Sequence, residues 1–213
     1  MPKKFWFLFL LPLVAFSQYS ADEWEARDEW MGLDNLFKHA TVTPGMNVAD
    51  IGCHEGYLTV RLARRVGSSG RVYAEDVNKV RLERLREHVQ TLNLDNVVTL
   101  LGEYDNPKLP LESFDRIFVI DTYHEIYDYK KVLRLLHRSL KRNGQLIILE
   151  KLKRRFEGES RQAQAFGHTM APNYVKEELY ETGFRVVDED LDHGLWENDP
   201  DKRMWFVVAE KAD

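Results

Sequence analysis

Hydrophobic positions follow two alternating periods along the chain, and the alternation predicts an α/β domain. Apolar runs of strand length occur at residues 46–51, 71–76, 96–101, 114–120, 145–150, 184–187 and 204–210. Between most of these runs, apolar residues recur every three or four positions, as at Leu82, Leu85, Val89 and Leu92, which indicates amphipathic helices. We therefore predict helices over residues 58–66, 78–92, 129–140 and 174–182.

The order of these segments predicts a doubly wound sheet of seven strands. Alternation of strands and helices favours parallel neighbouring strands with helices on both faces of the sheet. Residues 114–120 are nearly all apolar, which is typical of a parallel strand that is covered on both sides. No helical pattern separates the last two strands. We therefore expect a hairpin-like connection there and a last strand that runs antiparallel to its neighbours.

The first residues have a different character from the rest of the chain. Lys3 and Lys4 precede an apolar run over residues 5–16, and Ala15 and Ser17 are small residues at the positions that a signal peptidase reads. The run is too short to span a bilayer, which takes about 20 apolar residues. Residues 1–17 are therefore predicted to be a signal peptide that is cleaved after Ser17. The mature protein is expected to be exported, periplasmic or secreted, with no stable membrane span, and to be cytoplasmic if the leader is not processed.

The remainder is predicted to form a helical segment over residues 18–40 and a single domain over residues 41–213. Apolar and aromatic side chains, Trp24 and Trp30 among them, are interspersed with charges over residues 21–38, which favours one amphipathic helix. The tryptophans either line a pocket or pack this helix onto the domain. A net charge of −5 disfavours a nucleic-acid partner, which usually requires a basic face. The lone Cys53 excludes an internal disulfide.

The most specific motif lies at the turn between the first strand and the first helix of the domain. Asp50, Gly52 and Gly56 form the pattern Asp-x-Gly-x-x-x-Gly. Glycine allows a sharp turn and a close approach of a ligand to the backbone, and a helix N-terminus offers unpaired N–H groups. A dinucleotide fingerprint, G-x-G-x-x-G, is broken because His54 and Tyr57 occupy the places of its second and third glycines.

This pattern resembles motif I of the class I (Rossmann-like) S-adenosylmethionine (SAM) dependent methyltransferases, and the resemblance extends over residues 33–213. It implies a Rossmann-like doubly wound sheet, mostly parallel with the last strand antiparallel, and SAM as the cofactor. Asp50 is then expected to face the amino group of SAM, and Asp76, at the end of the second strand, to accept hydrogen bonds from the ribose hydroxyls. Glu103 matches the position near the adenine amino group.

Two of these assignments have a neighbour that could take the same role. Glu75 replaces Asp76 if the strand register is shifted by one residue, and Asp105 competes with Glu103. His54 stands where many members of the family carry a glycine. The expected cofactor-binding set is Asp50, Gly52, His54, Gly56, Asp76, Glu103 and Asp121.

The fourth strand ends in the cluster Asp121-Thr-Tyr-His-Glu125. Ligands in open α/β sheets bind beyond the carboxyl ends of the strands, so this cluster should face the same crevice as the glycines. We expect Tyr123 and His124 to contact the methyl acceptor, with His124 as the base because its ordinary pKa is near neutrality. His168, in the polar segment before the helix at 174–182, is the second candidate.

The residues thus favour in-line methyl transfer from SAM to a small-molecule acceptor. No metal ligand is predicted, because a catechol-type metal site would need further carboxylates beside Glu150 after the fifth strand. The competing hypothesis is a non-catalytic SAM-fold binding or interaction module, which His54 and the export signal favour. An NAD-dependent reductase is disfavoured by the broken fingerprint and by the absence of a well-supported Tyr-x-x-x-Lys pair.

Overall fold

The structure is a computed structural model that describes residues 24–212. The predicted signal peptide and the first residues of the predicted helical segment lie outside this range. None of the helices within it has the length and apolar character needed to cross a bilayer.

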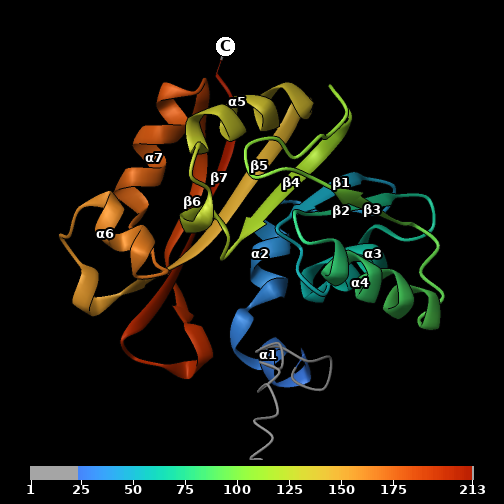
Figure 1. Ribbon diagram of the computed structural model, residues 1–213, viewed down its shortest axis with the longest axis horizontal. Helices are drawn as coiled ribbons and strands as arrows, with labels where there is room; N and C mark the ends of the chain where they lie inside the picture. The colour runs from blue at the N-terminus through green and yellow to red at the C-terminus, as the bar shows by residue number, and fades with distance from the viewer. Residues whose placement is uncertain (1–23, 213) are drawn as a thin grey trace, which may run out of the picture.

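Seven strands form one sheet in the order β3-β2-β1-β4-β5-β7-β6 (Figure 1). They are β1 (Asn47–Ile51), β2 (Arg71–Asp76), β3 (Val97–Leu101), β4 (Phe114–Ile120), β5 (Leu140–Lys153), β6 (Phe184–Leu195) and β7 (Lys202–Lys211). Neighbours from β3 to β5 are parallel, whereas β7 runs antiparallel to both β5 and β6. The doubly wound sheet with an antiparallel last strand is therefore confirmed.

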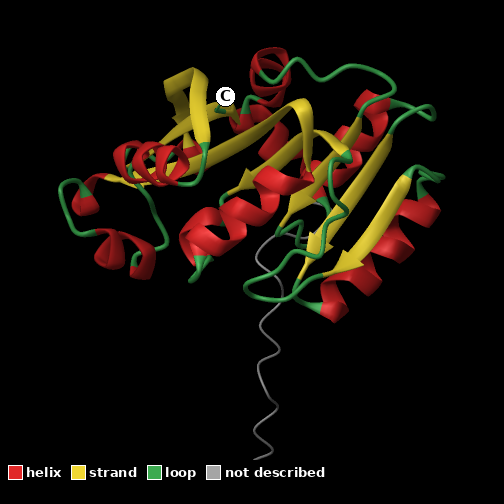
Figure 2. Ribbon diagram, turned by 90° about the horizontal axis from the view of Figure 1, so that it is seen from above, coloured by secondary structure: helices red, strands yellow, loops and turns green. Residues whose placement is uncertain are grey.

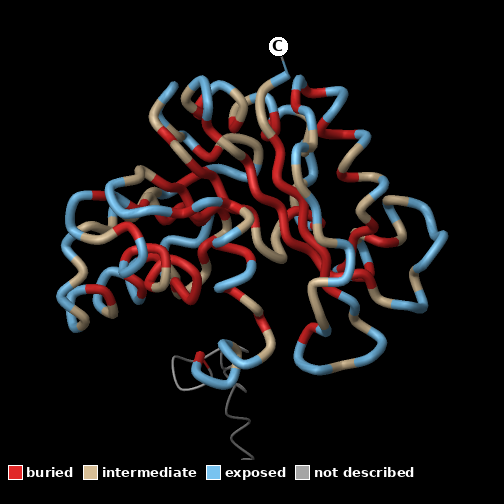
Figure 3. Tube along the Cα trace, turned by 180° about the vertical axis from the view of Figure 1, so that it is seen from behind, coloured by how far each residue is buried: buried red, intermediate tan, exposed pale blue. Residues whose placement is uncertain are grey.

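Helices cover both faces of this sheet (Figure 2). They are α1 (Trp24–Met31), α2 (Leu33–His39), α3 (Tyr57–Val66), α4 (Lys79–Thr91), α5 (Tyr129–Ser139), α6 (Arg161–Phe166) and α7 (Pro172–Glu181). Successive strand residues alternate between the two faces. Phe118 packs in the core with α2, α3 and α4, and its neighbours Ile117 and Val119 pack in the core with α5 and α7. The buried trace accordingly follows the central strands in Figure 3.

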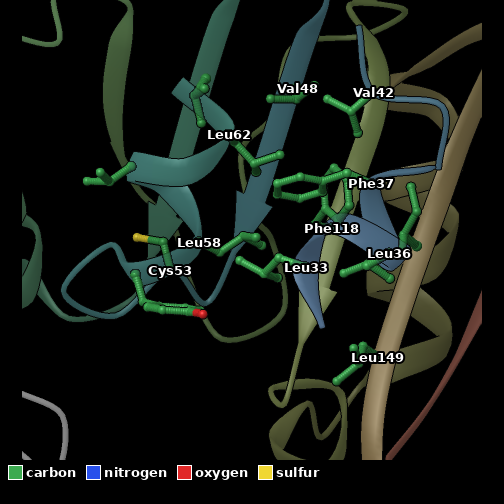
Figure 4. Packing of buried hydrophobic residues seen from close by; sticks show 14 of the residues in the cluster. Leu33, Leu36, Phe37, Val42, Val48, Cys53, Leu58, Leu62, Phe118 and Leu149 are labelled. Carbon is green, nitrogen blue, oxygen red and sulfur yellow. The ribbon is translucent and has the colours of Figure 1, made fainter. Parts of the chain in front are cut away.

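The first of these two cores fixes the helices that carry the glycine turn, the segment of residues 52–56. Leu58 and Leu62 of α3 and Phe37 of α2 pack against Val48 and Phe118 of the sheet (Figure 4). The rings of Phe37 and Phe118 meet edge to face, with centroids 6.1 Å apart. Fixing α3 in this way holds its N-terminus at the carboxyl end of β1.

The helix predicted over residues 21–38 is instead two helices. Gly32 separates α1 from α2 with a φ of 61°, and a Cβ built there would lie 3.0 Å from the ring of His193. The amphipathic pattern continues across this position, so the pattern itself does not reveal the break. The break lets α1 turn away from the sheet (Figure 1).

The later strands are longer than the sequence predicted. β5 begins at Leu140, where a continuing helix was expected, and β6 and β7 form a long hairpin that ends in a short 3₁₀ turn, η4 (Trp196–Asn198). Polar residues dominate β6 after Val187, so the greater part of this strand lacks the apolar run that marks the others. Its edge position explains the difference, because one side of it faces solvent.

Candidate functional site

A cavity of about 1,080 Å³ lies at the carboxyl ends of the parallel strands. Its walls come from the glycine turn, the ends of β2, β4 and β5, the loop at 167–169, α1 and η4. All predicted site residues line it except Gly56 and Tyr123. The expectation that the glycine motif, Asp76 and the cluster after the fourth strand share one crevice agrees with this placement.

The glycine turn passes very close to the loop after β4. Gly52 has a φ of +68°, and a Cβ built there would lie 2.4 Å from Cγ2 of Thr122. His54 also has a positive φ, 53°, which explains why a glycine suits this position, and its backbone N–H donates to Oδ2 of Asp76 over 2.9 Å. Gly56 does not line the cavity. It begins α3, and a Cβ there would overlap Leu85 of α4, so its role is to let the two helices pack.

Three buried carboxylates surround the glycine turn: Asp50, Glu75 and Asp76 are each 2–3% exposed. Asp50 accepts a hydrogen bond of 2.6 Å from the Thr59 hydroxyl. Burial raises the pKa of Asp50 to about 6, and burial together with the two neighbouring acids raises the pKa of Glu75 to about 8. A cationic ligand bound at this wall would therefore stabilise the ionised form of these carboxyl groups.

Asp76 and Glu75 both line the cavity but are held differently. Asp76 accepts from the backbone N–H groups of His54 and Asn78, which leaves lone pairs for a ligand. The Glu75 carboxylate accepts from the backbone N–H of Gly52, and a Cβ at Gly102 would overlap its Oε1. Glu75 thus ties the glycine turn to the residue that follows β3.

Of the two acids predicted near adenine, only Glu103 lines the cavity. It is exposed and forms an ion pair with Lys108 at 2.6 Å. Asp105 points elsewhere and pairs with Lys131 at 2.5 Å.

His124 lies at the other end of the cavity and is oriented by Glu150. Its Nδ1 lies 2.9 and 3.0 Å from the two carboxylate oxygens of Glu150, which also accepts from the His124 backbone N–H. Burial would lower the pKa of His124, but the adjacent carboxylate outweighs burial and raises it. Since Nδ1 is occupied, Nε2 is the atom available to a ligand.

Glu150 is fully buried at the carboxyl end of β5, and sequence reasoning missed its role. A single acid that ends a buried parallel strand was the available signal, because that end of the strand faces the ligand crevice. His168 also lines the cavity, and its ring meets that of His124 edge to face, with centroids 5.5 Å apart.

The expectation that Tyr123 contacts the acceptor is wrong. Its ring is 1% exposed in the core beneath α7, and its hydroxyl donates to Oε2 of Glu178 over 2.6 Å. Tyr123 and His124 lie in a 3₁₀ turn, η2 (Tyr123–Glu125), where successive side chains point in different directions. The turn sends His124 to the cavity and Tyr123 to the core.

Asp121 lines the cavity as an ion pair with Lys151, whose ammonium group also lies 4.6 Å from the centre of the Trp196 ring. Lys153 and Lys202 line the same wall. These cations and Trp196 escaped prediction because they belong to the extended part of β5 and to the β6–β7 hairpin.

Helix α1 closes the cavity from outside the sheet and contacts both of its ends. Asp28 accepts hydrogen bonds from Tyr57 and Arg61 of α3 at 2.5–2.7 Å. Trp30 packs against Trp196 of η4 with ring centroids 4.8 Å apart. Trp24 is buried and lines the cavity, so both roles considered for the tryptophans occur.

Comparison with known proteins gives a consistent family. A family model described as a methyltransferase domain matches residues 42–193. The chain is 30% identical over 147 residues to the ubiquinone/menaquinone biosynthesis C-methyltransferase UbiE of Enterobacter sp. (strain 638), a match that covers 66% of this chain and 59% of that protein. It is 30% identical over 116 residues to the (S)-coclaurine N-methyltransferase of Thalictrum flavum subsp. glaucum, with 54% and 32% covered. The chain thus spans less than two thirds of these relatives.

Solved structures share the fold. A SAM-dependent methyltransferase from Aquifex aeolicus superposes with a TM-score of 0.70 at 24% identity, covering 90% of this chain and 98% of that one. The [4+2]-cyclase SpnF superposes with a TM-score of 0.73 at 17% identity, covering 88% and 82%. At these identities the likeness establishes architecture alone.

Proposed function

Because the chain belongs to the family of class I SAM-dependent methyltransferases, we propose that it transfers a methyl group from SAM to a small-molecule acceptor. The observation that carries the proposal is the cavity itself, which joins three buried carboxylates at the glycine turn to an oriented histidine at its other end. The relatives include proteins named as C- and N-methyltransferases, which supports a small acceptor.

The residues at the glycine turn suit SAM. Its amino group and sulfonium are cationic, and Asp50 lies in the wall with a pKa raised by burial, so a neighbouring cation would favour its ionised form. Asp76 and Glu103 also line the cavity. We assign Asp76 to the vicinal ribose hydroxyls and Glu103 to the adenine. Gly52 leaves room for the close approach of a ligand to the backbone.

When bound, SAM supplies an activated methyl group, and the protein has to position the acceptor, exclude water and take up a proton. His124 is the group we assign to the proton, because Glu150 holds Nδ1 and leaves Nε2 toward the cavity. Glu150 acts through His124 as a positioning residue and stabilises the imidazolium that forms. Trp24 of α1 and Trp196 of η4 line the cavity and are the apolar surfaces that we assign to excluding water from a bound acceptor.

Calorimetric titration of the purified protein with SAM and with S-adenosylhomocysteine tests the proposal. We expect micromolar binding of both compounds and at least a tenfold loss of affinity in Asp76→Asn. The amide has one acceptor oxygen where the carboxylate has two, so it can no longer accept hydrogen bonds from both ribose hydroxyls in the same way. The matched control is Asp95→Asn, an exposed residue before β3, which should bind as the wild type does.

Two results would contradict parts of the proposal. Binding that is unaltered in Asp76→Asn would exclude the ribose assignment. A folded wild-type protein that binds neither compound would favour the non-catalytic module instead.

A further inference from the structure

Two histidines and a glutamate converge at the acceptor end of the cavity. Nε2 of His124 lies 3.9 Å from Oε1 of Glu125, and Nδ1 of His168 lies 3.7 Å from the same oxygen. One possible ligand atom from each of the three residues lies within 4.8 Å of those from the other two. A tetrahedral cation with bonds of about 2.1 Å has ligand atoms about 3.4 Å apart, so the three donors have to move closer together. The side chains of Glu125 and His168 are both exposed and can rotate to do so.

We propose that His124, Glu125 and His168 bind a divalent transition-metal ion, with Zn²⁺ as the expected occupant. Sequence reasoning predicted no metal ligand, because it sought further carboxylates after the fifth strand. The folded chain instead brings together one residue pair from η2 and one histidine from the loop after α6.

The support behind His124 is the first reason to expect a cation there. A histidine that binds a metal through one ring nitrogen commonly donates the other N–H to a carboxylate, which fixes the ring and raises its basicity. Glu150 provides this contact at 2.9 Å from a fully buried position. The tautomer that Glu150 favours leaves the Nε2 lone pair facing Glu125 and His168.

The anchoring of His168 is the second reason. Its φ of 51° is uncommon for a residue other than glycine, and such conformations concentrate at functional sites. The next residue, Thr169, donates its hydroxyl to the carbonyl of Lys151 and accepts from the N–H of Lys153. The loop is therefore fastened to β5, the strand that also carries Glu150.

A second possible donor set consists of Asp121, His124 and Glu150, whose ligand atoms lie equally close together. These atoms already contact other groups of the protein. The Asp121 carboxylate is paired with the Lys151 ammonium, and the Glu150 oxygens face Nδ1 of His124. A cation on that side would have to displace both partners, whereas the Nε2 side requires no exchange.

The donors also indicate the class of metal. Two imidazole nitrogens and one carboxylate suit zinc and its neighbours, whereas magnesium prefers oxygen ligands alone. Three protein ligands leave a position open, as in catalytic zinc sites, and here that position would face the cavity. The ion would then hold an oxygen or nitrogen of the acceptor and lower its pKa, so that the acceptor's proton passes to solvent and not to Nε2 of His124, which would bind the metal.

The test is titration of chelator-treated, dialysed protein with ZnCl₂ by calorimetry and with CoCl₂ by visible absorption, which reports the coordination of Co²⁺ directly. We expect saturable binding of one ion per chain. Glu125→Gln and His168→Asn should each weaken it at least tenfold. Asparagine is chosen because it tolerates a positive φ. The control is Glu197→Gln, which removes a negative charge from another wall of the same cavity and should stay within twofold of wild type.

Two results would overturn the proposal: no saturable binding of Zn²⁺ or Co²⁺ by the wild type, or binding that both ligand variants leave unchanged. Glu125 and His168 are exposed, so their variants should fold. SAM titration of the same variants should match wild type. Because metal binding is read without turnover, a protein that binds Zn²⁺ but no SAM would refute the proposed function and leave this inference standing.

Discussion

Replacing Gly52 by alanine should both destabilise the fold and impair cofactor binding. Gly52 has a φ of +68°, which the alanine would have to adopt, and the added Cβ would lie 2.4 Å from Cγ2 and 2.6 Å from Oγ1 of Thr122. Thr122 cannot simply rotate away, because it is β-branched and its hydroxyl donates to the carbonyl of Ile120. The variant therefore has two separate penalties, one from the backbone conformation and one from the overlap.

A substitution at a second glycine separates the free-energy cost of the backbone conformation from that of the overlap. A left-handed conformation costs a residue other than glycine about 1–2 kcal/mol, and forcing extra atoms into a packed region costs about 1–3 kcal/mol. Gly158 has a φ of +78°, but no atom lies within 4 Å of the position that a Cβ would take there, so Gly158→Ala carries the first penalty alone. We expect the free energy of unfolding to fall by about 2–5 kcal/mol in Gly52→Ala and by about 1–2 kcal/mol in Gly158→Ala.

Urea unfolding of both variants measures the difference, and SAM titration measures its effect on the site. Gly52→Ala should bind SAM at least tenfold more weakly, equivalent to about 1.4 kcal/mol, while Gly158→Ala binds normally. Equal destabilisation by the two substitutions would refute the close contact with Thr122. Normal SAM affinity in a folded Gly52→Ala would refute the role of the glycine turn as the cofactor cradle.

Three further predictions concern the acids and the residues of η2. The pKa of Asp50 is raised to about 6, so protonation below that pH removes the charge that a cationic cofactor prefers; SAM affinity should fall as the pH drops from 7 to 5, and calorimetry that finds a constant affinity would contradict this. Tyr123→Phe should lose about 1–2 kcal/mol of stability with the hydrogen bond to Glu178, yet keep normal turnover, as denaturation and rate assays can establish. His124→Ala and Glu150→Gln should both retain SAM binding and lower turnover, and normal rates in either would remove that residue from the mechanism.

The parts of the fold that repeat a simple pattern were predictable from the sequence. Apolar runs located the strands of the parallel half, and Asn78 was a clear start for α4, whose first N–H groups its side chain caps. Asp76 could be placed because it ends a strand, and strand ends determine where a ligand lies. Each of these predictions depends only on residues that are close to one another in the sequence.

The remaining features depend on contacts between distant segments. Nothing in the sequence next to His124 indicates that Glu150 holds its ring or that His168 meets it. The wrong assignment of Tyr123 has the same origin, since the direction of adjacent side chains in a 3₁₀ turn is decided by what packs on each side. The length of β6 was hidden because an edge strand buries only part of its residues.

Helix α1 contacts the elements at both ends of the cavity: Asp28 binds the helix that follows the glycine turn, and Trp30 packs on Trp196 of the hairpin, beside Lys151. A ligand at either end that shifts α1 must therefore alter the free energy of binding at the other. By thermodynamic linkage the effect is equal in both directions, so an acceptor that tightens the hold on SAM is itself held more tightly by the SAM-loaded protein. Helix α1 would thereby make the binding of the two ligands cooperative, whichever of them binds first.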